Sequence, residues 1–146
     1  QVVHGARVWS GDGRSIADHQ ESFDAVLADV PCTGLGALRR RPEVRWRRTV
    51  KDLSPLLQLQ MELSDAAISV LNPGGFFGYA TCSPHFAETT GQVRAILKKH
   101  PELTLLDLAS YLPENLDGAL REGSLSLWGH KHGTDSMFLA IFVKAK

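Results

Sequence analysis

The sequence has few cysteines and no long apolar run. It contains only Cys32 and Cys82, which are fifty positions apart. Two cysteines so far apart form neither a disulfide framework nor a CxxC redox motif. No apolar stretch approaches the ~20 residues of a membrane-spanning helix, and no secretory signal opens the chain. These absences predict a cytoplasmic protein with free thiols and no membrane partner.

The chain also lacks a net charge, but its charged residues are unevenly distributed. Its 146 residues hold 16 basic and 16 acidic side chains, 43% hydrophobic residues and 22% charged ones, as in one ordinary globular domain. The segment "RRRPEVRWRR" (39–48) holds six arginines and one glutamate. Arginines around a tryptophan are typical of a surface that binds nucleic-acid phosphates and bases. The alternative is a solvated loop with a buried indole. The predicted RNA contacts are Arg39, Arg40, Arg41, Arg45, Trp46, Arg47 and Arg48.

Strand and helix patterns alternate along the chain and predict a doubly wound α/β fold. Ser54 and Pro55 are expected to start a long helix as its N-cap and first residue. The last strand follows no crossover helix, so it is expected to run antiparallel to its neighbour. The predicted strands are 6–14, 23–30, 75–82, 103–109 and 136–145, and the predicted helices are 54–71 and about 85–99.

A carboxylate and two thiols are predicted to meet at one edge of the sheet. Asp29 and Cys32 lie at the end of one strand, and Cys82 ends another. Neighbouring parallel strands bring their carboxyl ends to the same edge, where open α/β sheets bind ligands. A single cysteine in an apolar strand is usually an inert core residue, but two in matching positions favour function. The helix after Cys82 is expected to favour its thiolate form.

The histidines of "GHKHG" do not predict a metal site. His130 and His132 have the alternation of a metal-binding pair, but no third ligand is evident. Polar contacts within a loop are therefore the expected role of both rings. Trp9 and Trp128 are expected to pack rather than to stack on bases.

Three stretches resemble successive motifs of one enzyme family. They are "DVPCTGLGALRRRPEVRWRR", "LNPGGFFGYATCS" and "HKHGTDSMFLAIF". They resemble the Fmu/Sun-type RNA (cytosine-5)-methyltransferases, and more closely the bacterial 16S ribosomal RNA branch, over roughly residues 12–144. The chain departs from the family pattern at Glu88-Thr89, where an acidic-Asn pair is usual, and at Ser136, where glycine is usual. The resemblance implies a Rossmann-like class I S-adenosylmethionine-dependent methyltransferase fold.

The resemblance also implies a mechanism. The enzyme would transfer a methyl group from S-adenosylmethionine to C5 of a cytosine in RNA, with 16S ribosomal RNA as the expected substrate. Cys82 would attack C6 of the ring and make C5 nucleophilic. Asp29 would contact the N3/N4 edge, and Cys32 would help to remove the C5 proton and release the product. The target base must be unstacked to reach these groups.

Only part of the family's cofactor site has a match. Asp12 corresponds to the residue that accepts from the adenine amino group, and Asp29 borders the same site. An Asx turn is the equally weighted alternative for Asp12. The glycine-rich turn of the first strand and the acidic residue of the second have no match. The resemblance therefore implies that residues 1–146 are the C-terminal portion of a single catalytic domain without its first two strands.

Such a portion is expected to bind the cofactor poorly and to be inactive alone. The strand at 6–14 would lack its native neighbour. The strand at 23–30 would become an exposed apolar edge, through which two copies could pair in a non-native dimer.

Other functions remain as alternatives. A DNA cytosine-5 methyltransferase would use Cys32 as the nucleophile, but the Cys82 motif and the arginine segment argue against it. A thiol-based redox or metal protein would need closer cysteines. A non-catalytic RNA-binding module stays open for this chain.

Overall fold

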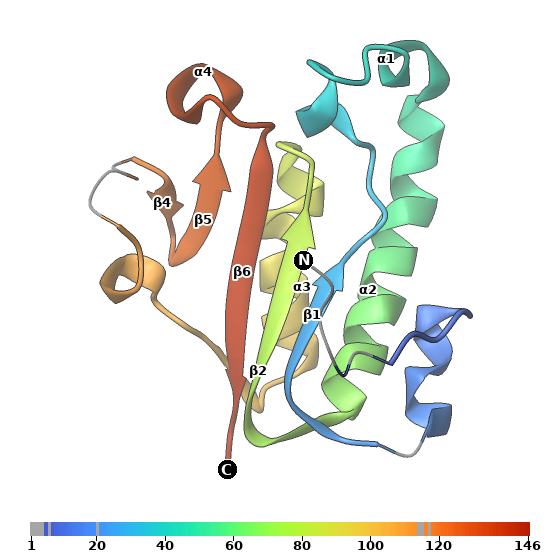
Figure 1. The fold of residues 1–146 in the computed structure, drawn as a ribbon, viewed down its shortest axis with the longest axis vertical. Helices are drawn as coiled ribbons and strands as arrows, with labels where there is room; N and C mark the ends of the chain where they lie inside the picture. Colours follow the sequence, from blue (N-terminus) through green and yellow to red (C-terminus); the bar gives the residue numbers. More distant parts are fainter. Residues whose placement is uncertain (1–4, 6, 20, 114–115, 117) are drawn as a thin grey trace.

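A computed structural model describes residues 5, 7–19, 21–113, 116 and 118–146. Its strands form one mixed sheet in the order β1-β2-β6-β5-β4, with β3 pairing with β6 (Figure 1). β1 and β2 are parallel, whereas β6 runs antiparallel to β2, β3 and β5, as predicted. The strands are β1 (Phe23–Asp29), β2 (Leu71–Thr81), β3 (Leu103–Leu105), β4 (Leu120–Arg121), β5 (Ser124–Leu127) and β6 (Met137–Lys144).

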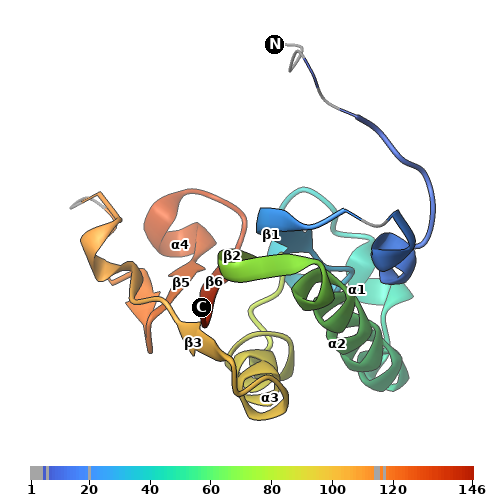
Figure 2. The ribbon, with the colours of Figure 1, turned by 90° about the horizontal axis from the view of Figure 1, so that it is seen from below.

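Two long helices cover one face of this sheet. They are α2 (Leu53–Ser69) and α3 (Thr90–Lys99), and both lie on the same side in Figure 2. Phe77 and Tyr79 of β2 point into this layer and are fully buried, because alternate strand residues face the same side. The shorter helices and turns are α1 (Val44–Arg47), α4 (Gly129–His132), η1 (Gly13–His19), η2 (Leu35–Ala37), η3 (Val50–Asp52), η4 (Phe86–Glu88) and η5 (Leu108–Ser110).

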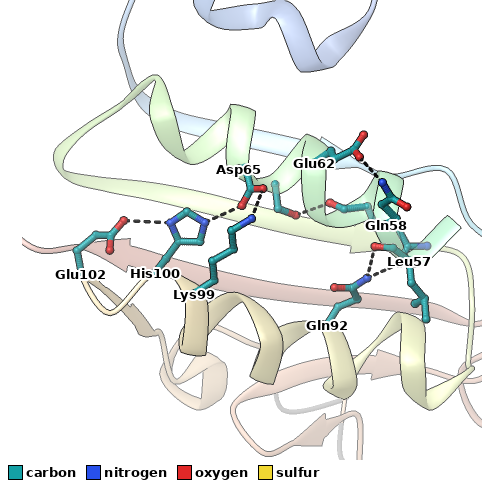
Figure 3. Close-up of polar contacts among 10 residues, drawn as sticks. Leu57, Gln58, Glu62, Asp65, Gln92, Lys99, His100 and Glu102 are labelled. Atoms are coloured by element: carbon teal, nitrogen blue, oxygen red, sulfur yellow. Dashed lines mark hydrogen bonds and ion pairs between the residues drawn. The ribbon is translucent and has the colours of Figure 1, made fainter. Parts of the chain in front are cut away.

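Polar contacts join the two long helices (Figure 3). Near the start of α2, Gln92 Nε2 donates to the Leu57 carbonyl at 2.8 Å. At the other end, Asp65 lies 2.6 Å from Lys99 Nζ and 2.8 Å from His100 Nε2. Lys99 and His100 lie at the carboxyl end of α3, where positive charge also favours the helix dipole. The helix layer is thus fixed at both ends beneath the sheet.

The predicted strand at 6–14 is wrong for the residues described. Residues 7–12 form no strand, and Gly13–His19 form the 3-10 turn η1 against α2; residue 6 lies outside the described residues. A strand needs a neighbour to pair its backbone groups, and no described strand lies beside this segment. The Asp12 side chain accepts from the Arg14 N–H at 3.0 Å and turns the chain instead.

The long helix also starts earlier than predicted. Asp52 is the N-cap of α2, and it also closes a capping box with Thr49 at the start of η3, where the Thr49 N–H and Oγ1 both donate to its carboxylate. Ser54 lies inside the first turn of α2 and is not its N-cap. Pro55 is tolerated there because the first-turn N–H groups need no helical partner.

Two further boundaries differ from the predictions. The strand predicted at 103–109 ends at Leu105, since the Asp107 side chain caps η5 by accepting from the Ala109 N–H. The β4–β5 hairpin was not predicted. Its turn, Glu122-Gly123, has φ of +49° and +77°, a pair of values typical of two-residue hairpin turns.

The predicted exposed edge is confirmed. β1 pairs with β2 alone among the described residues. Leu27 of β1 is 69% exposed and Phe76 of β2 is 46% exposed, on the face of the sheet away from α2 and α3. Pairing of two copies through this edge stays a prediction. Within the described ranges, no helix has the length and apolar content to cross a bilayer.

Candidate active site at the carboxyl edge of the sheet

The two cysteines meet where the parallel strands end. Asp29, the last residue of β1, pairs in register with Ala80 of β2, and β2 ends one residue later. The segments that follow β1 and β2 then turn away from the sheet, and the Sγ atoms of Cys32 and Cys82 lie 3.3 Å apart. The prediction that both thiols reach the same edge is confirmed.

An open cavity of about 440 Å³ lies beside these thiols. Asp29 is exposed at its wall, so carboxylate and thiols face one space. Two arginines of the predicted RNA-binding segment also line it. The lining residues are Asp29, Val30, Pro31, Cys32, Thr33, Gly34, Arg41, Val44, Arg48 and Cys82.

Gly36 lets three loops pack together at this edge. Its N–H donates to the Cys82 carbonyl at 2.9 Å, and its carbonyl accepts from the Ser136 N–H at 3.0 Å. A Cβ at this position would lie 2.1 Å from the Ser136 oxygen and 2.6 Å from the Cys82 oxygen. Only glycine fits there. The motifs PCTGLG, TCS and GTDS, which are far apart in the sequence, therefore form one structure.

The buried carboxylate of Glu88 joins the two cysteine loops. Its Oε1 accepts from the Thr33 N–H at 2.8 Å and from Gln60 Nε2 at 3.0 Å. Its Oε2 accepts from Thr33 Oγ1 at 2.5 Å and from Ser83 Oγ at 2.6 Å. Glu88 is fully buried. In the sequence, Glu88 stands out as half of the changed Glu88-Thr89 pair. The signal that could have indicated its contacts is the hydroxyl residue directly after each cysteine, Thr33 and Ser83.

The Cys82 thiol does not have the environment that the sequence predicted. Burial, together with the hydrogen bond to Cys32 and the nearby Asp29 charge, raises the pKa of Cys82 to about 11. The expected stabilisation of its thiolate by a helix dipole is wrong. α3 begins only at Thr90, and the single turn η4 comes between. At neutral pH the resting form of Cys82 is the thiol.

The arginine segment folds over the cysteine loops. Arg40 pairs with Asp135 of the GTD motif, and Arg39 lies 3.8 Å from the same carboxylate. The Asp135 side chain is 7% exposed, and its hydrogen bond to Arg40 lowers its pKa. Arg48 donates to the Cys32 carbonyl at 3.4 Å. Trp46, in α1, is 77% exposed, so the alternative of a buried indole is wrong.

Arg45 and Arg47 are exposed in α1, and Arg41 lies 3.6 Å from Glu43. Of the predicted RNA-contact residues, Arg41 and Arg48 therefore line the cavity beside the thiols, whereas Asp135 partly neutralises Arg39 and Arg40.

Asp12 lies apart from the thiols, in an exposed turn. The Arg14 guanidinium donates to both of its oxygens and lowers the pKa of Asp12 to about 2. This is the Asx-turn alternative, so a contact between Asp12 and the cofactor stays a prediction. A cavity of about 230 Å³ runs from Gly13 and Ile16 of η1 along β1 to Asp29.

His132 makes the loop contact expected of it. Its Nδ1 accepts from the Trp128 N–H at 2.9 Å, at the start of α4. Among the described residues, no three His, Cys, Asp or Glu side chains are grouped as metal ligands. Trp9 stacks on His19 with ring centroids 4.7 Å apart.

The arrangement of the three motifs has known counterparts. The family described as 16S rRNA methyltransferase RsmB/F matches residues 2–143. The chain belongs to this family. It is 51% identical over 129 residues to the putative methyltransferase Rv1407 of Mycobacterium tuberculosis, covering 88% of this chain and 28% of that protein. It is 37% identical over 141 residues to ribosomal RNA small subunit methyltransferase B of Salmonella agona, covering 95% and 31%.

Solved structures agree with the RsmB/F assignment. The crystal structure of PH0851 superposes with a TM-score of 0.80 at 34% identity, covering 90% of this chain and 29% of that one. NSun6 from Pyrococcus horikoshii, solved with SFG, has a TM-score of 0.79 at 28% identity, covering 96% and 35%. The Rossmann-like methyltransferase fold is therefore confirmed. The chain spans about three tenths of the length of the curated relatives described above.

Proposed function

We propose that this chain carries the thiol half of an active site that methylates C5 of a cytosine in RNA, with 16S ribosomal RNA as the substrate and S-adenosylmethionine as the methyl donor. The observation that carries the proposal is the 3.3 Å contact between two thiols beside Asp29 in one open cavity. Membership of the RsmB/F family supports the reaction class and the RNA. Such an enzyme would act in the cytoplasm, where bacterial ribosomes are made.

Two thiols suit this chemistry because the reaction needs a covalent bond that forms and later breaks. Cys82 loses its proton, and its sulfur bonds to C6 of cytosine, which makes C5 nucleophilic. C5 takes the methyl group and then loses its own proton. The ring electrons return, and the S–C6 bond breaks. We infer that Cys32 helps to remove that proton and to release the product, and its 3.3 Å contact with the sulfur of Cys82 supports this role.

Exposure favours Cys82 over Cys32 as the attacking thiol. Cys32 is buried, whereas Cys82 is partly open to the cavity. This supports the RNA-type assignment over the alternative in which Cys32 attacks a DNA cytosine. Because the resting Cys82 is protonated, its thiolate must form within the RNA complex. Arg41 and Arg48 supply positive charge at the wall of the same cavity.

The groove along β1 fits part of a cofactor site. S-adenosylmethionine supplies the methyl group when bound, and the neighbour solved with SFG, an analogue of it, supports this choice. Asp29 and Val30 of this chain line the groove of about 230 Å³ with Gly13 of η1, so they would hold the cofactor beside the thiols. The Asp12 carboxylate is occupied by Arg14 and would have to share its oxygens.

RNA would approach from the basic surface formed by α1 and the segment before it. Six arginines and the exposed Trp46 offer contacts to phosphates and a stacking platform for a base. Asp29, exposed at the wall of the cavity, would accept from the exocyclic amine of the unstacked cytosine.

Bisulfite sequencing of 16S ribosomal RNA tests the proposal. Cells with the gene for this chain intact or disrupted, and disrupted cells complemented with the wild-type or Cys82→Ala gene, should be compared. We expect one protected cytosine that is lost on disruption, returns with the wild-type gene and stays lost with Cys82→Ala. Identical bisulfite maps for intact and disrupted cells would contradict the proposal. A chain that only binds RNA would give that result.

A further inference from the structure

One carboxylate oxygen connects the residues that follow the two cysteines. Thr33 comes directly after Cys32, and Ser83 comes directly after Cys82. Both hydroxyls donate to Glu88 Oε2, and they lie 3.2 Å from each other. The other oxygen of Glu88 holds the Thr33 backbone. The buried Glu88 carboxylate therefore anchors the residue that directly follows each cysteine.

The anchor is itself fixed to the core. Tyr79 of β2 donates to the Glu88 carbonyl at 2.8 Å. Gln60 of α2 donates to the Glu88 carboxylate and to the Pro31 carbonyl, both at 3.0 Å. Tyr79, Gln60 and Glu88 are all fully buried. These contacts tie Glu88 to β2 and α2, so we expect its carboxylate to keep its place when the cysteine loops move.

We propose that Glu88 is a positioning residue, which holds the Cys32 and Cys82 loops in register so that their thiols stay in contact. It does not touch either sulfur in the described contacts and is not a catalytic residue. Removing one hydroxyl leaves a buried carboxylate oxygen short of a donor and frees one cysteine loop. The consequence for methylation rests on the proposed function, whereas the placement of the thiols does not.

The rate at which iodoacetamide alkylates each cysteine measures this placement without RNA or cofactor. Tight contact with Cys32 and burial keep Cys82 protonated, with a pKa of about 11, and hence slow to react. Thr33→Val and Ser83→Ala should each loosen that contact. We expect each to speed alkylation of Cys82 at pH 8 about threefold, because a one-unit fall in pKa raises the thiolate fraction about tenfold while the less basic thiolate is a weaker nucleophile. Peptide mass spectrometry assigns the label to each cysteine.

Thr81→Val is the matched control. Thr81 directly precedes Cys82, is fully buried, and its hydroxyl has no hydrogen-bond partner among the described residues. This substitution also removes a buried hydroxyl next to the cysteine, but it leaves the contacts of Glu88 intact. We expect the alkylation rate of Thr81→Val to equal that of the wild type.

Glu88→Gln separates geometry from charge. Its amide oxygen can accept from the Thr33 N–H and from Gln60, and its NH₂ group can donate to the two hydroxyl oxygens. We expect it to retain slow alkylation of Cys82, whereas Glu88→Ala should react at least as fast as Thr33→Val. If Glu88→Ala does not fold, the double variant Thr33→Val/Ser83→Ala takes its place.

Three results would overturn the proposal. The first is wild-type alkylation in Thr33→Val and in Ser83→Ala. The second is a faster alkylation of Cys82 whose rate rises with urea concentration as steeply as the unfolding equilibrium does. Such a result would mean that Cys82 reacts only in the unfolded chain, as a purely structural role predicts. The third is a Glu88→Gln variant as reactive as the variant that lacks the carboxylate. None of these depends on whether the protein methylates RNA.

Discussion

The thiol side and the cofactor side of the proposed active site are built differently. On the thiol side, the buried side chains of Tyr79 in β2, Gln60 in α2 and Ser83 after β2 converge on Glu88 of η4 and fix two loops. On the cofactor side, the equivalent carboxylate, Asp12, lies in an exposed turn with Arg14. Buried networks hold a single geometry, whereas exposed ion pairs contribute little. This chain therefore preorganises the proposed thiol side of the site and leaves the proposed cofactor side loosely defined.

The largest difference between the two sides is expected in the stability lost when a glycine is replaced by alanine. Gly36→Ala places a Cβ against the Ser136 and Cys82 carbonyl oxygens, and backbone cannot move aside there. We expect the unfolding free energy to fall by about 1–3 kcal/mol or more, measured by urea denaturation. Gly11→Ala, on the cofactor side, has no atom within 4 Å of the added Cβ and serves as the control. Equal stability of the two variants would mean that the three loops do not pack as described.

Each arginine of the segment 39–48 should contribute to RNA binding to the extent that no acidic side chain neutralises it. Arg45 and Arg47 have no acidic partner among the described contacts. Replacing them should lower the slope of log K against log salt by roughly 0.7–0.9 for each phosphate that the protein no longer neutralises. Replacing Arg39 and Arg40 should change the slope less, because Asp135 already neutralises part of their charge. Fluorescence anisotropy with a single-stranded RNA at several salt concentrations measures both. Equal slopes for the wild type and both pairs of variants would mean that the segment is a solvated loop that does not contact RNA phosphates.

The raised pKa of Cys82 predicts a pH dependence of stability. Burial raises this pKa from 9.0 to about 11, so the folded state holds the thiol proton more tightly than the unfolded state. The resulting contribution to stability is complete below pH 9 and is lost as the pH rises towards 11. The unfolding free energy of Cys82→Ser should therefore fall less steeply than that of the wild type between these values. Parallel curves in urea denaturation would contradict the burial of this thiol.

The smallest effect is expected on the cofactor side. Asp12→Asn removes the charge that Arg14 binds, but both side chains are about half exposed and solvent screens the pair. The thermal unfolding midpoint should not change measurably by calorimetry. A clear fall would show that the turn at Asp12 is a structural anchor, and the contrast with the thiol side would disappear.

The same contrast explains what the sequence could predict. β1, β2, α2 and β6 each contain their own apolar pattern. β2 pairs with β1 and β6, and α2 packs against β1 and β2, so the positions of these elements and the meeting of Cys32 and Cys82 followed from the sequence. The segment at 6–14 has a strand-like pattern without a described strand beside it, and local Asp12–Arg14 contacts determined its shape. A pattern indicates how a segment can fold, whereas its neighbours decide whether it does.

Glu88 and the state of Cys82 could not be predicted for a related reason. A glutamate near the start of a helix is typical of favourable dipole interactions, and nothing local indicates that it is buried. Its partners Gln60 and Thr33 are 28 and 55 positions away. The pKa of Cys82 likewise depends on Cys32, which only the folded sheet brings close.

The most direct test of the proposed function is to identify the atom that bonds to the RNA. An oligonucleotide with 5-azacytosine at the target position has a ring that is more open to thiol attack at C6. With S-adenosylmethionine present, it should form a complex with the protein expressed from the intact gene for this chain, and that complex should survive a denaturing gel. Mass spectrometry of the digested complex should place the nucleotide on Cys82, and Cys82→Ala should form none. A complex through Cys32, or an undiminished complex in Cys82→Ala, would contradict the assignment.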